Sequence, residues 1–148
     1  MDAYIIIGNP NTRKASVVRS LTGCFNRNLR DIAVPGTKAP LRLYARVGAL
    51  QETRTRPEDF IAEVAGKRCQ AVLCCLSPSA HEREPMLFPD APSYLNQLKA
   101  AGWRIRSIAV LGQNTGGVRA QNLQQFIQAG IAPINATAAA VRAHFGWA

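Results

Sequence analysis

The feature that most constrains this fold is a set of short apolar runs separated by segments with helical spacing. Ala71–Leu76 is apolar at every position, which is typical of a strand buried on both faces of a parallel sheet. Ala3–Ile7 is a similar run, and it stops at the turn signal Gly8-Asn9-Pro10. Strands of this kind need helices on both faces to remove them from water. The sequence therefore predicts an α/β fold of three layers.

Periodicity and glycine or proline boundaries place the other elements. Leu41–Val47 alternates apolar and polar residues, as a half-exposed strand does, and Asp31–Val34 is its predicted hairpin partner. The other predicted strands are Arg104–Leu111 and Ile131–Ile134. The predicted helices are Ala15–Asn26, Pro57–Gly66, Ser93–Ala101, Val118–Ala129 and Thr137–Phe145. This order predicts one domain over residues 1–148, with a mostly parallel sheet of about five or six strands and one antiparallel edge strand.

The chain is strongly basic, with 18 Lys+Arg against 9 Asp+Glu and a formal net charge of +9. No acidic residue follows Asp90, so any functional carboxylate must come from the earlier part of the chain. This charge fits a nucleic acid, an acidic protein partner or an arginine-rich solvated surface. The sequence has no apolar run long enough for a membrane span and no signal-peptide pattern, and its four cysteines follow no motif. We therefore expect a cytoplasmic protein that does not bind a membrane.

In parallel sheets, ligands bind beyond the carboxyl ends of the strands. The segments predicted at that edge are Gly8–Ser16, Val47–Arg56, Ser77–Glu84, Gly112–Gly117 and Asn135–Thr137. Basic side chains are frequent among them. The expected partner contacts are Arg46, Arg54, Arg56 and the aromatic residues Phe145 and Trp147. The two aromatic side chains either pack on the sheet or dock to a partner or to a second copy of the chain.

The sharpest motif is GNPNTRKAS at residues 8–16, between the first predicted strand and the first predicted helix. It resembles the Walker A loop, G-x-x-x-x-G-K-[ST], because Gly8 and Lys14 match in type and spacing. Arg13 replaces the second glycine, and Ala15 replaces the hydroxyl residue that binds Mg²⁺. The wider run GNPNTRKASVVRSLTG is similar to the opening of a small GTPase domain, in which GNPNxGKSSLxxxLTG is a familiar pattern.

The resemblance extends along the chain in the order of the GTPase motifs. The D-x-x-G position reads ARVG at residues 45–48, without the aspartate. The N-K-x-D position reads GQNT at residues 112–115, and the last element reads NAT at residues 135–137. The resemblance thus implies a P-loop GTPase-like fold from which metal-binding and guanine-reading groups have been lost. It suggests Gly8, Asn11, Arg13, Lys14 and Ser16 as phosphate-binding residues, and Gln113 and Asn114 as base-edge residues.

From these replacements we expect a catalytically impaired GTPase-like domain that acts as a binding or assembly protein with a protein partner. We expect no enzyme activity, no metal and no tightly bound cofactor, and the sequence assigns no catalytic residue. One alternative is an atypical nucleotide- or phosphate-binding NTPase in which Arg13 and Lys14 replace the metal. A second alternative is a basic nucleic-acid-binding protein.

Overall fold

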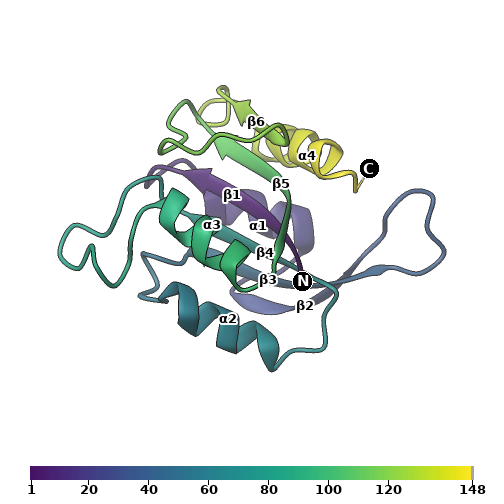
Figure 1. Cartoon of the computed structure of the whole chain (residues 1–148). Coiled ribbons are helices and arrows are strands. Elements are labelled where there is room, and N and C mark those ends of the chain that lie inside the picture. Colours follow the sequence, from purple (N-terminus) through teal and green to yellow (C-terminus); the bar gives the residue numbers. More distant parts are fainter. Residues whose placement is uncertain (148) are drawn as a thin grey trace.

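The computed structural model describes residues 1–147, in which six strands form one sheet with helices on both faces (Figure 1). The strands are β1 (Asp2–Gly8), β2 (Arg27–Ile32), β3 (Leu41–Ala49), β4 (Ala71–Leu76), β5 (Arg104–Leu111) and β6 (Leu123–Phe126). The helices are α1 (Lys14–Thr22), α2 (Pro57–Ala65), α3 (Ala91–Ala100) and α4 (Ile134–Phe145). The predicted α/β class is confirmed. None of these helices is long and apolar enough to cross a membrane, within the part of the chain described.

The strand order across the sheet is β2-β3-β4-β1-β5-β6. Strand β2 pairs antiparallel with β3 at one edge, and all other neighbouring strands are parallel. The expected mostly parallel sheet with an antiparallel edge strand is therefore confirmed. The antiparallel strand is Arg27–Ile32 rather than Asp31–Val34. Pairing ends at Ile32 opposite Leu41, so residues 33–34 belong to the connection that contains the Pro35-Gly36 turn and not to the strand.

The central strands separate two apolar cores. Every residue of β4 is buried, and neighbouring residues alternate between the core under α1 and α4 and the core under α2 and α3. Cys75 lies in the first core and Cys74 in the second, so the two adjacent thiols point to opposite faces. Burial raises the pKa of the Cys75 thiol to about 12, which is consistent with an inert apolar role.

Two elements near the end of the chain differ from the prediction. The predicted helix Val118–Ala129 is wrong, because this stretch forms turns around the short edge strand β6. Pairing with β5 prevails over the local helix propensity of this stretch. The Asn122 side-chain amide donates to Ile105 O at 2.8 Å and so holds the start of β6 against β5. The predicted strand Ile131–Ile134 is also wrong. Pro133 is the residue before the first turn of α4, and it supports the start of a helix rather than a strand.

The aromatic side chains at the end of the chain are part of the core. Phe145 and Trp147 are buried and pack on Tyr4 of β1, with ring centroids 5.2 and 4.9 Å from that ring. Of the two alternatives that the sequence left open, packing on the sheet is the one the structure shows.

The connections leave β1 and β4 in opposite directions. The chain passes from β1 to α1 on one face of the sheet and from β4 to α3 on the other face (Figure 1). Because β1 and β4 are neighbours, their carboxyl ends diverge and leave a crevice between the two loops. In open α/β sheets, ligands bind at such a switch point.

The N-terminus of α3 offers a test of this architecture. The Asp90 carboxylate accepts hydrogen bonds from Ser93 N at 3.0 Å and Ser93 Oγ at 2.7 Å, which caps the helix that follows the β4 loop. Asp90→Ala should therefore lower the free energy of unfolding by about 1 kcal/mol in urea denaturation. Asp90→Asn keeps an accepting oxygen and serves as the control, with a smaller loss. Equal losses in both variants would show that the cap contributes nothing.

Candidate functional site

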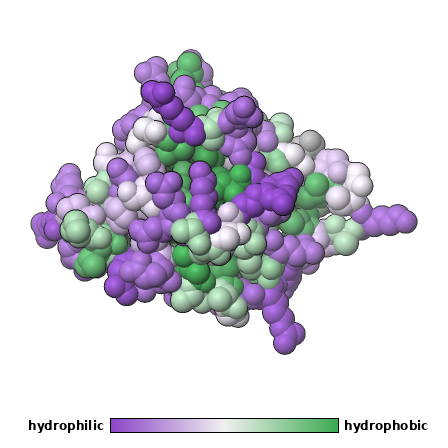
Figure 2. Space-filling view, viewed as in Figure 1, coloured by the Kyte–Doolittle hydropathy of each residue, from purple (hydrophilic) through white to green (hydrophobic). Residues whose placement is uncertain are grey.

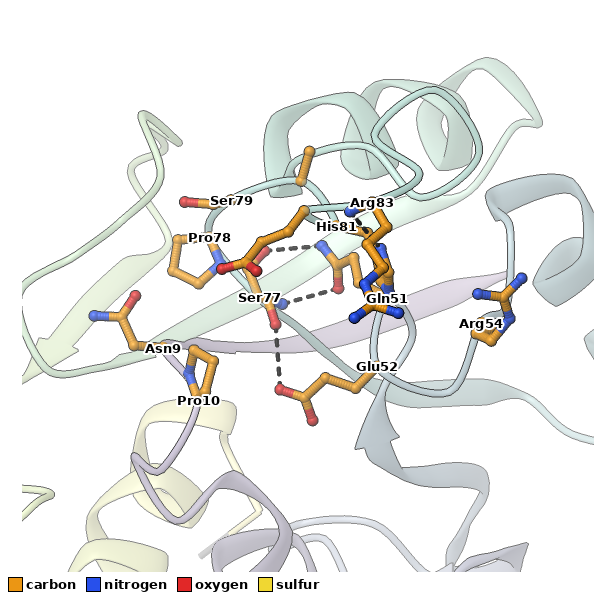
Figure 3. Close-up of a pocket in the computed structure, with 12 residues that line it drawn as sticks. Asn9, Pro10, Gln51, Glu52, Arg54, Ser77, Pro78, Ser79, His81 and Arg83 are labelled. Atoms are coloured by element: carbon orange, nitrogen blue, oxygen red, sulfur yellow. Dashed lines mark hydrogen bonds between the residues drawn. The ribbon is translucent and has the colours of Figure 1, made fainter.

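Two adjoining cavities lie at the carboxyl ends of β1, β3 and β4. The larger is about 600 Å³ and lies between the loops after these strands (Figure 3). The smaller is about 330 Å³ and lies between the start of α1 and the end of β3. Pro10 and Glu52 line both cavities, so the two form one site on either side of these residues. The combined space matches that of ordinary small-molecule sites.

Lys14 is the charged group at the centre of this site. Its side chain is only 6% exposed, and its ammonium donates to Gly8 O at 2.7 Å and to Asn9 O at 3.0 Å. Glu52 Oε1 lies 3.8 Å from the same nitrogen. Burial lowers the pKa of Lys14, and the nearby Glu52 carboxylate opposes that shift. The ammonium is thus a preorganised positive charge at the edge of the smaller cavity, which Lys14 lines.

The backbone of the Gly8–Ser16 loop turns tightly and has two residues in the left-handed region, as a phosphate-binding loop often does. Asn11 and Arg13 have φ values of 68° and 70°, a left-handed conformation that favours glycine. A methyl group at Gly8 would collide with Thr12 Oγ1, so the loop passes close to its own start. Arg13 occupies the position of the second glycine in the Walker A pattern, and it adopts a left-handed backbone conformation of the kind that glycine adopts easily.

The first turn of α1 presents free backbone amides. Within residues 1–147, the amides of Lys14, Ala15 and Ser16 form no hydrogen bond, and no side chain caps the helix. Unpaired amides at a helix start attract anions, because their N–H groups and the helix dipole favour negative charge. Lys14 and Ala15 line the smaller cavity, whereas Ser16 is half-buried in the same turn outside its lining.

Arg13 is directed away from the loop. Its guanidinium donates to Ala132 O at 2.8 Å and lies 3.5 Å from Ala129 O, both in the connection between β6 and α4. Arg13 and Lys14 both line the smaller cavity, but the Arg13 guanidinium is engaged by these backbone oxygens. Arg13 thus ties the loop to the start of α4.

Gln51 holds the larger cavity together. This buried amide donates to Ser77 O at 2.9 Å and accepts from Ser77 N at 2.9 Å, which joins the loop after β3 to the loop after β4. The next residue, Glu52, points toward Ser77, whose hydroxyl lies 3.5 Å from Glu52 Oε1 (Figure 3). Glu52 thus faces Ser77 on one side and Lys14 on the other.

The loop after β4 is ordered by its own contacts. His81 Nδ1 accepts from the backbone amides of Arg83 and Glu84, both at 3.2 Å, and the ring packs on Phe88. The Arg54 guanidinium lies over the Phe88 ring, 5.3 Å from its centroid, and pairs with the Glu84 carboxylate at 2.8 Å. Arg54, one of the predicted partner contacts, thus joins the wall of the larger cavity to the loop after β4.

Two other predicted partner contacts are engaged within the chain. Arg46 is 5% exposed, and its guanidinium binds the Glu63 carboxylate at 2.9 Å together with the hydroxyls of Thr53 and Thr55. Arg56 pairs with Asp59 in the first turn of α2, at 2.8 Å. Arg46 is therefore an interior residue, and Arg56 supports its own helix.

The predicted base-edge residues lie on the loop after β5. The Asn114 amide donates to Asn9 Oδ1 at 3.0 Å and its oxygen accepts from Gly116 N at 3.0 Å. The backbone oxygen of Gln113 accepts from the Gln125 amide at 3.1 Å. The structure thus brings Asn114 to the phosphate-type loop, but both polar atoms of its side chain already have partners.

The sequence places Gln51, Glu52 and Ser77 in segments at the ligand edge, but it assigns them no role. The signal available was their position, since each follows the end of a predicted strand at the ligand edge. No cluster of three or more metal-ligating His, Cys, Asp or Glu side chains occurs among the residues described.

Comparison with known proteins gives no relative from which to transfer a function. No protein-family model, no curated protein and no solved structure matches this chain.

The burial of Arg46 can be tested through its counterion. Glu63→Gln leaves the Arg46 guanidinium in the interior without a carboxylate, and should lower the free energy of unfolding by about 2 kcal/mol in urea denaturation. Glu58→Gln makes the same change on the exposed face of the same helix and should have no measurable effect. Equal effects of the two variants would contradict the interior role of Arg46.

Proposed function

We propose that this domain binds a phosphate-bearing ligand in the Gly8–Ser16 loop and uses that binding for recognition or assembly rather than for turnover. In this proposal the chain is a P-loop GTPase-like domain with impaired catalytic machinery. The observation that supports it most is the buried Lys14 ammonium beside the free first-turn amides of α1, at the edge of an open cavity. The resemblance of residues 8–16 to a Walker A loop supports the same ligand class.

Two features favour anion binding. Lys14 is already held in place by Gly8 O and Asn9 O, so a ligand does not have to order a flexible lysine. The amides of Lys14, Ala15 and Ser16 can donate to phosphate oxygens without breaking hydrogen bonds of the protein.

The replaced residues weigh against hydrolysis. Ala15 has no hydroxyl for a metal ion, and Ala45, at the position of the missing aspartate, is fully buried in the core under α1. Arg13 is engaged with backbone oxygens near α4. The structure therefore offers less support for the alternative in which Arg13 and Lys14 together replace the metal.

Glu52 opposes the binding of an anion beside Lys14. Its carboxylate lies 3.8 Å from the Lys14 ammonium and is 48% exposed. A phosphate group approaching Lys14 would meet this negative charge, so Glu52 must turn away or lower the affinity. The domain would then bind phosphate with moderate strength, as suits a recognition module.

The central prediction concerns Lys14. Isothermal titration calorimetry with GTP, ATP and pyrophosphate should show binding in EDTA that Mg²⁺ does not enhance. Lys14→Met should weaken it by about tenfold, because a charge-assisted hydrogen bond to phosphate is lost.

Arg19→Met is the control, since Arg19 is an exposed basic residue in the last turn of α1 that lines neither cavity. It should bind like the original chain. Binding that requires Mg²⁺ and leads to GTP hydrolysis would overturn the proposal, as would the absence of binding under both conditions.

A second prediction concerns Glu52. Glu52→Gln removes the negative charge that faces Lys14 and should tighten pyrophosphate binding by about threefold, measured by the same titration. Glu58→Gln is the control, because it changes the net charge by the same amount at a residue of α2 that lines neither cavity. Weaker binding in Glu52→Gln than in Glu58→Gln would mean that Glu52 helps to hold the ligand.

A further inference from the structure

Several positive charges near the ligand edge are paired with carboxylates of the same chain. Lys14 faces Glu52, Arg54 pairs with Glu84, and Arg56 pairs with Asp59. Arg46, which starts nearby on β3, is buried against Glu63. The net charge of +9 must therefore be expressed elsewhere on the surface.

Seven basic residues lie on segments at or leading to the opposite edge of the sheet, where the parallel strands begin. We call this group the amino-edge set: Lys38, Lys67, Arg68, Lys99, Arg104, Arg106 and Arg119. All seven side chains are exposed, and none forms an ion pair among the residues that the structure describes. On other segments of the described chain, the basic residues that also form no ion pair are Arg13, Arg19, Arg30, Arg83 and Arg142. Figure 2 shows hydrophilic side chains on all sides of this view, including the right-hand side, where Figure 1 places the β2–β3 turn.

The strand register brings these residues to one edge. Asp2 of β1 is opposite both Ala71 of β4 and Arg104 of β5, so these three strands begin at the same level. Asn122 donates to Arg106 O at 3.0 Å, so the chain lies beside β5 three residues after Arg119. With strands about 4.8 Å apart, the edge from β3 to β6 extends about 19 Å.

Few acidic groups oppose this charge. Asp31 is paired with Arg42 at 3.1 Å, and Asp2 is only half-exposed at the start of β1. Trp103 lies within the set, between Lys99 and Arg104, and its half-buried ring packs edge-on against Phe60.

The composition of the surface favours nucleic acid over an acidic protein. Protein interfaces have an apolar centre, but of the exposed large apolar side chains in the described residues only Met1, which is 38% exposed and accepts at its backbone oxygen from Arg104 N, lies at this edge. Phe25 follows α1, Met86 and Leu87 lie in the loop after β4, and Ile127 and Ile131 follow β6. Four of the seven basic residues are arginines, which bind phosphate with two parallel hydrogen bonds.

We infer that the amino-edge set is a surface that binds the phosphate backbone of a nucleic acid without reading its sequence. It lies at the end of the sheet opposite the Gly8–Ser16 loop, so this second site is distinct from the proposed phosphate-loop function and does not depend on it.

Fluorescence anisotropy of the full chain with labelled 20-nucleotide single-stranded DNA, its duplex and RNA of the same sequence tests this inference. Affinity for at least one of these should fall steeply with salt, linearly on a double-logarithmic plot. Arg106→Gln should weaken binding by about threefold and make the salt slope shallower by about one. The triple variant Arg104→Gln/Arg106→Gln/Arg119→Gln should lose most of the affinity.

Arg83→Gln is the matched control, since Arg83 is an exposed arginine on the loop after β4 at the other edge. It should leave DNA and RNA binding nearly unchanged. Circular dichroism checks that each variant is folded. The inference is overturned if Arg83→Gln weakens binding as much as Arg106→Gln, if none of the three nucleic acids binds at low salt, or if polyglutamate competes as well as DNA of equal charge. The last result would indicate an acidic protein partner.

Discussion

The parallel pairing of β1 with β4 is the interaction on which the rest of the structure depends. Both strands are buried on both faces, so helices must cover the sheet on either side. Because α1 covers one face and α3 the other, the chain leaves these neighbouring strands in opposite directions. The crevice, the loop at the start of α1 and the two cavities all follow from this divergence.

The charge placed at that divergence explains much of the local geometry. Lys14 is removed from water, which lowers its pKa, and the carbonyls of Gly8 and Asn9 compensate for the lost hydration. Arg13 turns toward the connection before α4, where it satisfies the oxygens of Ala129 and Ala132. The loop is thus held in shape from both sides without a ligand, which is the preorganisation that a recognition site needs.

The sequence predicts elements well where burial decides the outcome. Strands Ala71–Leu76 and Arg104–Leu111 were predicted with the bounds that the structure shows, because the inner part of each is apolar. The region around β6 was mispredicted, since this edge strand is specified by its pairing with β5 rather than by its own residues.

At the site, the motif located Lys14 and the loop, but spacing along the chain could not reveal that Glu52 would face Lys14 or that Arg13 would turn away. Both depend on the arrangement of distant segments. The buried position of Arg46 was equally hidden, because its counterion Glu63 lies on another element.

The molecule has two ends of different character: cavities and exposed apolar side chains at the carboxyl edge of the sheet, and unpaired basic side chains at the amino edge. The claim that the carboxyl edge binds phosphate is tested most directly by nuclear magnetic resonance of the ¹⁵N-labelled chain, titrated with pyrophosphate in EDTA. The account predicts saturable shifts of the Lys14, Ala15 and Ser16 amides, and saturation of the Ala15 and Ser16 shifts at about tenfold higher pyrophosphate in Lys14→Met. No shift of these amides at saturating pyrophosphate, or shifts that occur only with Mg²⁺, would contradict it.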